Sequence, residues 1–171
     1  MERTLTDVKF RREGMASSSG KETAAWCEAI VTTASSAPEF IDITDEVERI
    51  VADSGVRFGQ ATVYSCHTTA AIRVNEKEPL LLEDMARVLN EIAPLHADYG
   101  HNDFSRRTVN IEEEECANGH AHCQHLFLST SETLPILDGK LPLGTWQRIF
   151  LVELDRPRER RVLVNVLGVK E

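Results

Sequence analysis

The 171-residue chain has few aromatic side chains and no excess of positive charge. Phe, Trp and Tyr together make up only 6% of the sequence, and the formal net charge at pH 7 is −9. A nucleic-acid-binding surface needs clustered Lys and Arg to neutralise phosphates, so this charge argues against a nucleic-acid partner. A local basic pocket for a small phosphate ester is still compatible with the total.

Long hydrophobic runs and paired cysteine motifs are also missing. No apolar run reaches the roughly 18 residues that a membrane span requires, and the N-terminus has no hydrophobic signal segment. The four cysteines form no C-x-x-C motif, and a chain of this length can bury a core without disulfide bonds. We therefore expect a soluble, cytoplasmic protein with free thiols and no membrane partner.

A single folded domain is expected after a flexible start. The first 24 residues are charged and rich in Ser and Gly and show no sustained apolar period, which is typical of a flexible extension. Residues 25–171 have the size of one domain, and 42% of the whole chain is apolar. The sequence contains no internal repeat.

Apolar patterns predict several strands interrupted by two or three helices. A helix is expected from Thr44 to Gly55, with Thr44 as its N-cap, and a second helix from Pro79 to Pro94. Strands are expected at 28–34, 39–43, 59–66, 70–75, 145–154 and 160–168. Because strands and helices do not alternate regularly, the pattern predicts an α+β fold on a mainly antiparallel sheet or sandwich.

Histidines are concentrated in one segment. Residues 115–126, ECANGHAHCQHL, contain three of the six histidines and two cysteines. Neutral imidazoles are common zinc ligands, and a catalytic zinc site needs three protein ligands. His120 and His122 would share a face on a strand, whereas His122 and His125 would share one on a helix. This segment therefore cannot complete a metal site alone, and spacing leaves metal binding and bystander roles equally open.

Polar residues follow one of the predicted strands. His67, Thr68 and Thr69 come directly after the strand at 59–66. Their hydroxyls and backbone N–H groups could donate hydrogen bonds to a phosphate, and an ordinary strand-end turn is the alternative.

Other polar positions also have two interpretations. Asn75 and Glu76 fit either a helix-capping pair or a polar pocket, and Asp84 is either solvated or orients a histidine ring. Gly144 and Trp146 fit a glycine turn beside a core tryptophan as well as a pocket wall.

Several motifs in combination resemble one protein family. HTTAAIRVNEKEP with Asp84, DYGHNDF, NGHAH and DGKLPLGTWQRIFLVELDRPRERRVLVNVLG occur in this order. From about Trp26 to the C-terminus the chain resembles the YjbQ family, whose members are often labelled secondary thiamine-phosphate synthase. The resemblance implies a compact α+β fold and a homotrimer with sites near subunit interfaces. It also implies a divalent metal, with zinc expected and magnesium as the alternative.

The resemblance also implies roles for individual residues. It makes His67, His101 and His122 the metal ligands. Four neighbouring side chains match no family role: Cys116, His120, Cys123 and His125. Contacts to substrate or phosphate are expected from Thr68, Thr69, Asn75, Asn118, Gly144, Thr145, Trp146, Gln147 and Arg160.

Three functions are compatible with these residues. The family label implies a synthase that couples a pyrimidine pyrophosphate to a thiazole phosphate. Three imidazoles suit zinc better than magnesium, so the competing hypothesis is a zinc-dependent hydrolase or lyase acting on a small phosphorylated metabolite. Glu76 or Asp84 would then be the catalytic proton acceptor. The third hypothesis is a non-enzymatic trimer that binds a metal or ligand.

Overall fold

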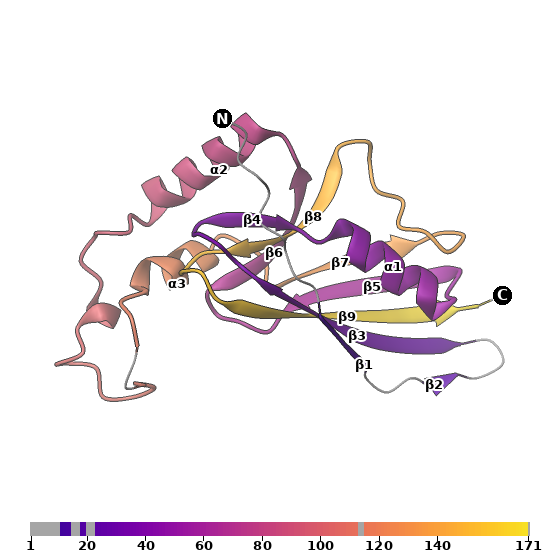
Figure 1. The fold of residues 1–171 in the computed structure, drawn as a ribbon, viewed down its shortest axis with the longest axis horizontal. Coiled ribbons are helices and arrows are strands. Elements are labelled where there is room, and N and C mark those ends of the chain that lie inside the picture. The colour runs from indigo at the N-terminus through magenta and orange to yellow at the C-terminus, as the bar shows by residue number, and fades with distance from the viewer. Residues whose placement is uncertain (1–10, 15–17, 20–22, 113–114, 171) are drawn as a thin grey trace.

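The strands form two sheets in which every ladder is antiparallel (Figure 1). The computed structural model describes residues 11–14, 18–19, 23–112 and 115–170. A six-stranded sheet contains β1 (Arg11–Gly14), β2 (Ser18–Ser19), β3 (Ala24–Thr33), β9 (Glu159–Val169), β5 (Phe58–Ser65) and β7 (Ser131–Ile136). A three-stranded sheet has the order β4 (Glu39–Asp42), β8 (Gln147–Glu153), β6 (Ala70–Glu76).

Three α-helices and one short turn of 3₁₀-helix complete the described part of the chain. They are α1 (Thr44–Ser54), α2 (Pro79–Ile92), η1 (Gly100–Asn102) and α3 (Gly119–His125). In Figure 1, α1 lies at the end of the molecule near the C-terminus, whereas α2, α3 and η1 gather at the opposite end. The prediction of an α+β fold on antiparallel sheets with two or three helices is confirmed.

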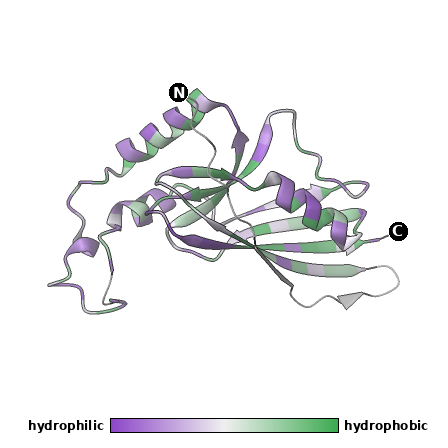
Figure 2. Cartoon of the chain, in the orientation of Figure 1, coloured by the Kyte–Doolittle hydropathy of each residue, from purple (hydrophilic) through white to green (hydrophobic). Residues whose placement is uncertain are grey.

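Strand β8 separates two hydrophobic cores. Ile149 and Leu151 belong to the core shared with the six-stranded sheet and α1. Phe150 and Val152 belong to a second core, which also contains Leu89 of α2. Because successive side chains of a strand point to opposite faces, the unbroken apolar run of β8 is explained by burial on both sides. Figure 2 shows the hydrophobic colouring concentrated along the strands.

Helix α1 follows its prediction closely, with a shift at its start. Gly55 ends the helix in a left-handed conformation with φ 69°, as expected for a C-terminal glycine. Thr44 is the first helical residue, and Ile43 occupies the N-cap position. The Thr44 hydroxyl donates to Asp42 Oδ1 over 2.7 Å and accepts from the Ile149 N–H over 2.8 Å. Thr44 therefore joins α1 to both neighbouring strands instead of capping its own helix.

The structure differs from the sequence prediction in two places. The predicted extension contains β1 and β2, which pair with β3 and cover its backbone edge, while its remaining residues up to Glu22 lie outside the described residues. Strand β7 was not predicted. The predicted strands at 145–154 and 160–168 are confirmed as β8 and β9, and they lie in different sheets. No helix in the described residues is both long and apolar enough to cross a membrane.

Candidate functional site

All three predicted metal ligands line one cavity of about 730 Å³, which we call the histidine cavity. His67 follows β5, His101 is in η1, and His122 is in α3. Four arginines share the lining, and so do polar residues from the turn after β5 and the start of α3: Arg107, Arg156, Arg158, Arg160, Thr68, Thr69 and Asn118. The fold thus places three imidazoles and four guanidinium groups around one cavity, together with Glu112 and Glu115.

Two of the imidazoles are in contact with each other, and the third accepts a hydrogen bond from the backbone. The rings of His101 and His122 meet edge to face, with their centroids 4.7 Å apart. His67 Nε2 accepts a hydrogen bond from the backbone N–H of Arg161 over 2.8 Å. In a neutral ring the proton of His67 is then on Nδ1.

The chemistry of these donors fits a borderline divalent cation such as zinc. Burial lowers the pKa of His67 below 6.5, and the charge of Arg160 lowers it further. Burial also lowers the pKa of His122, with His101 adding to the effect. Both rings are therefore neutral near pH 7, which is the form that binds metals.

The side chains are not arranged as a closed metal site. Among the residues that the structure describes, no three His, Cys, Asp or Glu side chains are placed to hold a metal ion together. Coordination by His67 would require it to release the Arg161 N–H, because the opposite ring nitrogen carries the proton. The three histidines are therefore suitable ligands by type and location, and a metal would have to reorient at least one of them.

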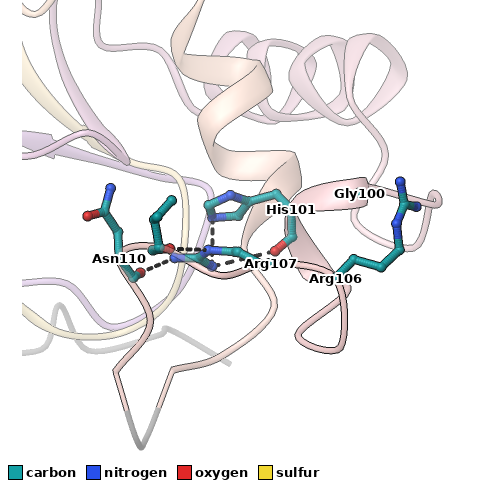
Figure 3. A pocket seen from close by; sticks show the side chains of 6 residues that line it. Gly100, His101, Arg106, Arg107 and Asn110 are labelled. Atoms are coloured by element: carbon teal, nitrogen blue, oxygen red, sulfur yellow. Dashed lines mark hydrogen bonds between the residues drawn. The ribbon is translucent and has the colours of Figure 1, made fainter.

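Arg107 lines the histidine cavity and also a neighbouring pocket that it shares with His101, Arg106 and Asn110, which Figure 3 shows. Its Nη1 lies 3.3 Å from His101 Nε2 and donates to Glu115 Oε1 over 2.6 Å. Its other terminal nitrogen donates to the carbonyl of Asn110. The hydrogen bond from Arg107 lowers the pKa of Glu115, so this carboxylate stays ionised. Arg107 was not predicted from the sequence, because it lies in a loop outside the motifs that pointed to the site.

Arg160 lines the cavity, but its hydrogen bonds are directed into the protein. It forms two hydrogen bonds with Glu153, and its Nη2 donates to Thr69 Oγ1 over 2.9 Å. Arg160 is 2% exposed and Glu153 is fully buried. Glu153 also accepts from the N–H groups of Leu154 and Asp155. Arg160 therefore anchors Thr69 and the turn after β8, and its guanidinium is less available to a ligand than the sequence suggested.

Arg156 and Arg158 are the other cations of the cavity. Arg158 Nη1 donates to Asp155 Oδ2 over 3.2 Å. Arg156 Nη1 is buried and, within the part of the chain that the structure describes, finds no hydrogen-bond partner. The sequence does carry a signal for both residues, because the turn DRPRER after β8 places three arginines at alternate positions.

Close packing between α3 and η1 positions His122 beside His101. A Cβ atom added to Gly119 would lie 2.6 Å from Tyr99 Cβ and 3.0 Å from Asn102 Oδ1. Gly119 N–H donates to that same Asn102 oxygen over 2.9 Å. Only glycine permits this approach at the first residue of α3. Asn118 lies at the N-cap position, but its buried Oδ1 makes no hydrogen bond to described residues.

A second cavity of about 500 Å³ adjoins the first and is called the thiol cavity here. It shares four residues with the histidine cavity: Cys66, His67, Thr68 and His122. The rest of its lining comes from β5, α3 and the segment after α3: Tyr64, Ser65, Cys123, His125, Leu126 and Thr130. His67 and His122 therefore line both cavities, and two residues that matched no family role, Cys123 and His125, line the second.

The remaining predicted site residues lie elsewhere. Asn75 and Glu76 end β6, where Glu76 pairs with Gln147 at the start of β8. Gly144, Thr145 and Trp146 precede Gln147, and Trp146 is 69% exposed. Because Thr69 precedes the other end of β6, a strand length of roughly 20 Å separates these residues from the histidine cavity.

Asp84 also lies away from the histidine cavity. It is on the exposed side of α2 and accepts from Arg87 over 3.0 Å. The structure thus brings together His67, His101, His122, Thr68, Thr69, Asn118 and Arg160 and leaves out Asn75, Glu76, Asp84, Gly144, Thr145, Trp146 and Gln147.

Comparison with known proteins identifies relatives of the whole domain. The family model described as "UPF0047 protein YjbQ-like" matches residues 28–169. A UPF0047 protein of Methanothermobacter thermautotrophicus is 41% identical over 130 residues, which cover 76% of this chain and 83% of that protein. A second UPF0047 protein, from Archaeoglobus fulgidus, is 41% identical over 129 residues, or 75% of this chain and 91% of its own length.

Solved structures share the same fold. A YbjQ-like protein of unknown function from Sulfolobus solfataricus is 37% identical and superposes with a TM-score of 0.76, covering 85% of this chain and 99% of that one. A hypothetical protein from Aeropyrum pernix is 35% identical with a TM-score of 0.73, covering 83% and 98%.

Proposed function

This chain belongs to the YjbQ-like UPF0047 family, and from the contents of its histidine cavity we propose that it binds and transforms a small phosphorylated metabolite. One observation carries the proposal: three histidines and four arginines line the same cavity. Phosphate oxygens are recognised by guanidinium groups, and neutral imidazoles suit either proton transfer or a borderline divalent metal.

Different residues of the histidine cavity would bind the phosphate and the metal. Arg107, Arg156 and Arg158 would neutralise the charge of the phosphate, and the exposed Thr68 hydroxyl would donate to one of its oxygens. Arg160 would act indirectly, by fixing Thr69 through the hydrogen bond described above. His67, His101 and His122 would hold a divalent metal, with zinc preferred, and a bound zinc would activate water or polarise a phosphoryl oxygen.

The small number of carboxylates in the histidine cavity favours a hydrolase or lyase over a magnesium-dependent enzyme. Magnesium is usually bound through carboxylates, and among the described residues only Glu112 and Glu115 supply them to the lining. Glu115 already pairs with Arg107. The test is to incubate purified protein, with and without zinc, with a broad set of phosphate esters. Metal-dependent release of phosphate or another product is expected, and no turnover of any compound would reject the enzymatic proposal in favour of binding alone.

Thiamine-phosphate synthase activity is a second candidate, favoured by the space around the histidines. Two cavities of about 730 and 500 Å³ meet at His67 and His122, which leaves room for two small substrates side by side. Purified protein should then form thiamine phosphate from the pyrimidine pyrophosphate and the thiazole phosphate. His122→Ala should abolish this activity, and product formation that survives the substitution would point to a contaminating enzyme.

Metal binding can be tested apart from activity. Elemental analysis of the purified protein should find a divalent metal, and His67→Ala, His101→Ala and His122→Ala should each lower its content. His96, which is exposed, and His120, which is buried on the other side of α3, serve as controls. His96→Ala and His120→Ala should retain the metal. Equal metal content in all five variants would contradict the three-histidine assignment.

We also propose that the site is completed by other copies of the chain in a homotrimer. The apolar stripe of α2 is largely uncovered, since Val88 and Ile92 are 43% and 44% exposed and only Leu89 is buried. Trp146 is exposed as well, at the end of β8 far from the histidines. A neighbouring subunit could bring that end, with Glu76 and Gln147, to the histidine cavity. Sedimentation should show a trimer; a monomer at micromolar concentration would remove this proposal.

A further inference from the structure

A third cavity of about 350 Å³ lies where the segment before β4, the end of α2 and the turn after β8 meet α3. We call it the proline cavity, after Pro38 and Pro94 in its lining. It shares no lining residue with the histidine cavity or the thiol cavity, and it contains His120 of α3 where the histidine cavity contains His122. The proposed function therefore gives this cavity no role.

The proline cavity has a carboxylate in its lining but no fixed positive charge. Asp155 lines it, and the described lining contains no Lys or Arg. The Asp155 side chain is 2% exposed. Among the described side chains only that of Arg158 donates to it, over 3.2 Å to Oδ2. The other carboxylate oxygen of Asp155 is therefore left to accept a hydrogen bond from a ligand.

His120 supplies a second acceptor. The residue is 4% exposed, and its ring forms a hydrogen bond with the backbone of Leu154. Because the Leu154 N–H already donates to Thr69 and Glu153, the ring donates to the Leu154 carbonyl. His120 Nδ1 is buried and has no hydrogen-bond partner among the described residues, so Nε2 is the donor and Nδ1 of the neutral ring is an acceptor. A buried acceptor without a donor is costly, and a ligand N–H group would remove that cost.

We propose that the proline cavity binds a small primary amine, whose ammonium group donates to Asp155 and His120. Its alkyl stem packs against Pro38, Pro94 and Leu95. An ammonium group has three donors and no acceptor, which matches the two acceptors of the lining. A cavity of roughly 150 Å³ is enough for benzene, so about 350 Å³ accommodates a short alkylamine.

Occupation of the proline cavity affects the histidine cavity through one ion pair. Asp155 lines the first cavity and Arg158 the second, and the two side chains are paired. An ammonium group at Asp155 competes with Arg158 for the carboxylate, and the Arg158 side chain, 43% exposed, is then free to bind a phosphate oxygen. The amine should therefore strengthen the binding of phosphate, and phosphate should strengthen that of the amine by the same factor.

Three ligands with a similar stem test the site on the full chain. In ligand-observed NMR titrations at pH 7, n-butylamine should bind, 1-butanol should bind at least about tenfold more weakly, and butyrate should not bind. Equal affinity for butylamine and butanol would overturn the proposal, and so would the absence of amine binding. Nα-acetyl-lysine methylamide carries the same ammonium group on a peptide. If it binds more tightly than butylamine, the occupant is a lysine of a partner protein and not a free amine.

Two aspartates provide a matched pair of variants. Asp155 lines the proline cavity, whereas Asp98 is exposed and does not. Asp155→Asn should weaken the binding of butylamine at least about tenfold, and Asp98→Asn, with the same change in net charge, should not alter it. Leu95→Ala changes a side chain that is 50% exposed, so the fold should tolerate it, and it should weaken butylamine but not methylamine. Unchanged butylamine affinity in both Asp155→Asn and Leu95→Ala would contradict the assignment.

The effect on the histidine cavity has its own measurement. Saturating butylamine should raise the affinity for inorganic phosphate about fivefold in the wild type. Arg158→Gln should bind phosphate more weakly and should lose this response to the amine. If the two ligands bind independently in the wild type, the connection through Arg158 is rejected and the amine site stands. If phosphate does not bind at all, the proposed function fails, while the butylamine titrations still decide the proline cavity.

Discussion

The two ends of strand β8 differ in how deeply their charged and polar side chains are buried. At its C-terminal end Glu153 and Arg160 form a buried ion pair below the histidine cavity. At its N-terminal end Gln147 and Trp146 are exposed, and Arg148 forms ion pairs with Asp42 and Asp45 near the surface. The first end is fixed by interactions within the subunit, whereas the second leaves polar and aromatic groups uncovered. The C-terminal end of β8 therefore lies beside the proposed phosphate site, whereas the N-terminal end offers the surface that we propose for contact with another subunit.

Removing one member of the buried ion pair should have the largest effect. Glu153→Ala leaves the Arg160 charge buried without its carboxylate and should lower the free energy of unfolding by about 3–5 kcal/mol. Gln147→Ala, at the exposed end of the same strand, should change it by less than about 0.5 kcal/mol. Urea denaturation of both variants measures the difference. Similar losses at the two ends would contradict the comparison.

A methyl group at the close contact between α3 and η1 should have the next largest effect. Gly119→Ala must push Tyr99 away and should cost about 1–3 kcal/mol in the free energy of unfolding. The displacement also separates His122 from His101, so binding of inorganic phosphate and metal should weaken. Gly100→Ala is the control, because a Cβ atom there meets no atom within 4 Å. Calorimetric titration should find normal binding in this control and reduced binding in Gly119→Ala.

At the exposed end of β8, the contribution of Asp42 to the stability of the fold should depend on pH. Burial opposes ionisation of Asp42, but hydrogen bonds from Thr44, Arg148 and Lys77 outweigh it and lower its pKa from 3.8 to about 2. Because the folded pKa is the lower one, Asp42 stabilises the fold fully above pH 3.8, and this contribution is lost as the pH falls from 3.8 to about 2.

The contribution of Asp42 amounts to at most about 2 kcal/mol. Comparison of wild type with Asp42→Asn in urea at several pH values isolates it from the other carboxylates. The difference in unfolding free energy should be largest above pH 4 and should shrink towards pH 2. A difference that does not vary with pH would show that Asp42 acts through packing alone.

Substitution of the exposed tryptophan should have the smallest effect on the folded subunit. Trp146→Ala removes a side chain that is 69% exposed, so subunit stability should change by less than about 1 kcal/mol. The same change should weaken self-association, because apolar surface at this end is where a second copy would pack. Sedimentation velocity over a range of concentrations measures this. Unchanged association would show that the interface does not lie at this end of β8.

Much of the secondary structure was predictable because local patterns specify it. Gly55 ends α1, Pro79 begins α2, and the apolar runs mark β3, β8 and β9. Strand β7 escaped prediction because Pro135 and the polar residues at 131–133 interrupt its pattern. The strand forms because its backbone pairs with β5, which is distant in the sequence, and no local pattern of residues predicts that pairing.

The amino-acid sequence by itself determined the fold class and the residue types of the site, because apolar periodicity and motifs are local features of the sequence. Only the tertiary structure decided which of those residues meet. It placed three histidines and four arginines around one cavity and left the Trp146 segment a strand length away. It also turned Arg160 inward to Glu153 and added Arg107 from a loop. The physical reason is that burial and the pairing of β6 with β8 join residues far apart in sequence, and no local pattern records those contacts.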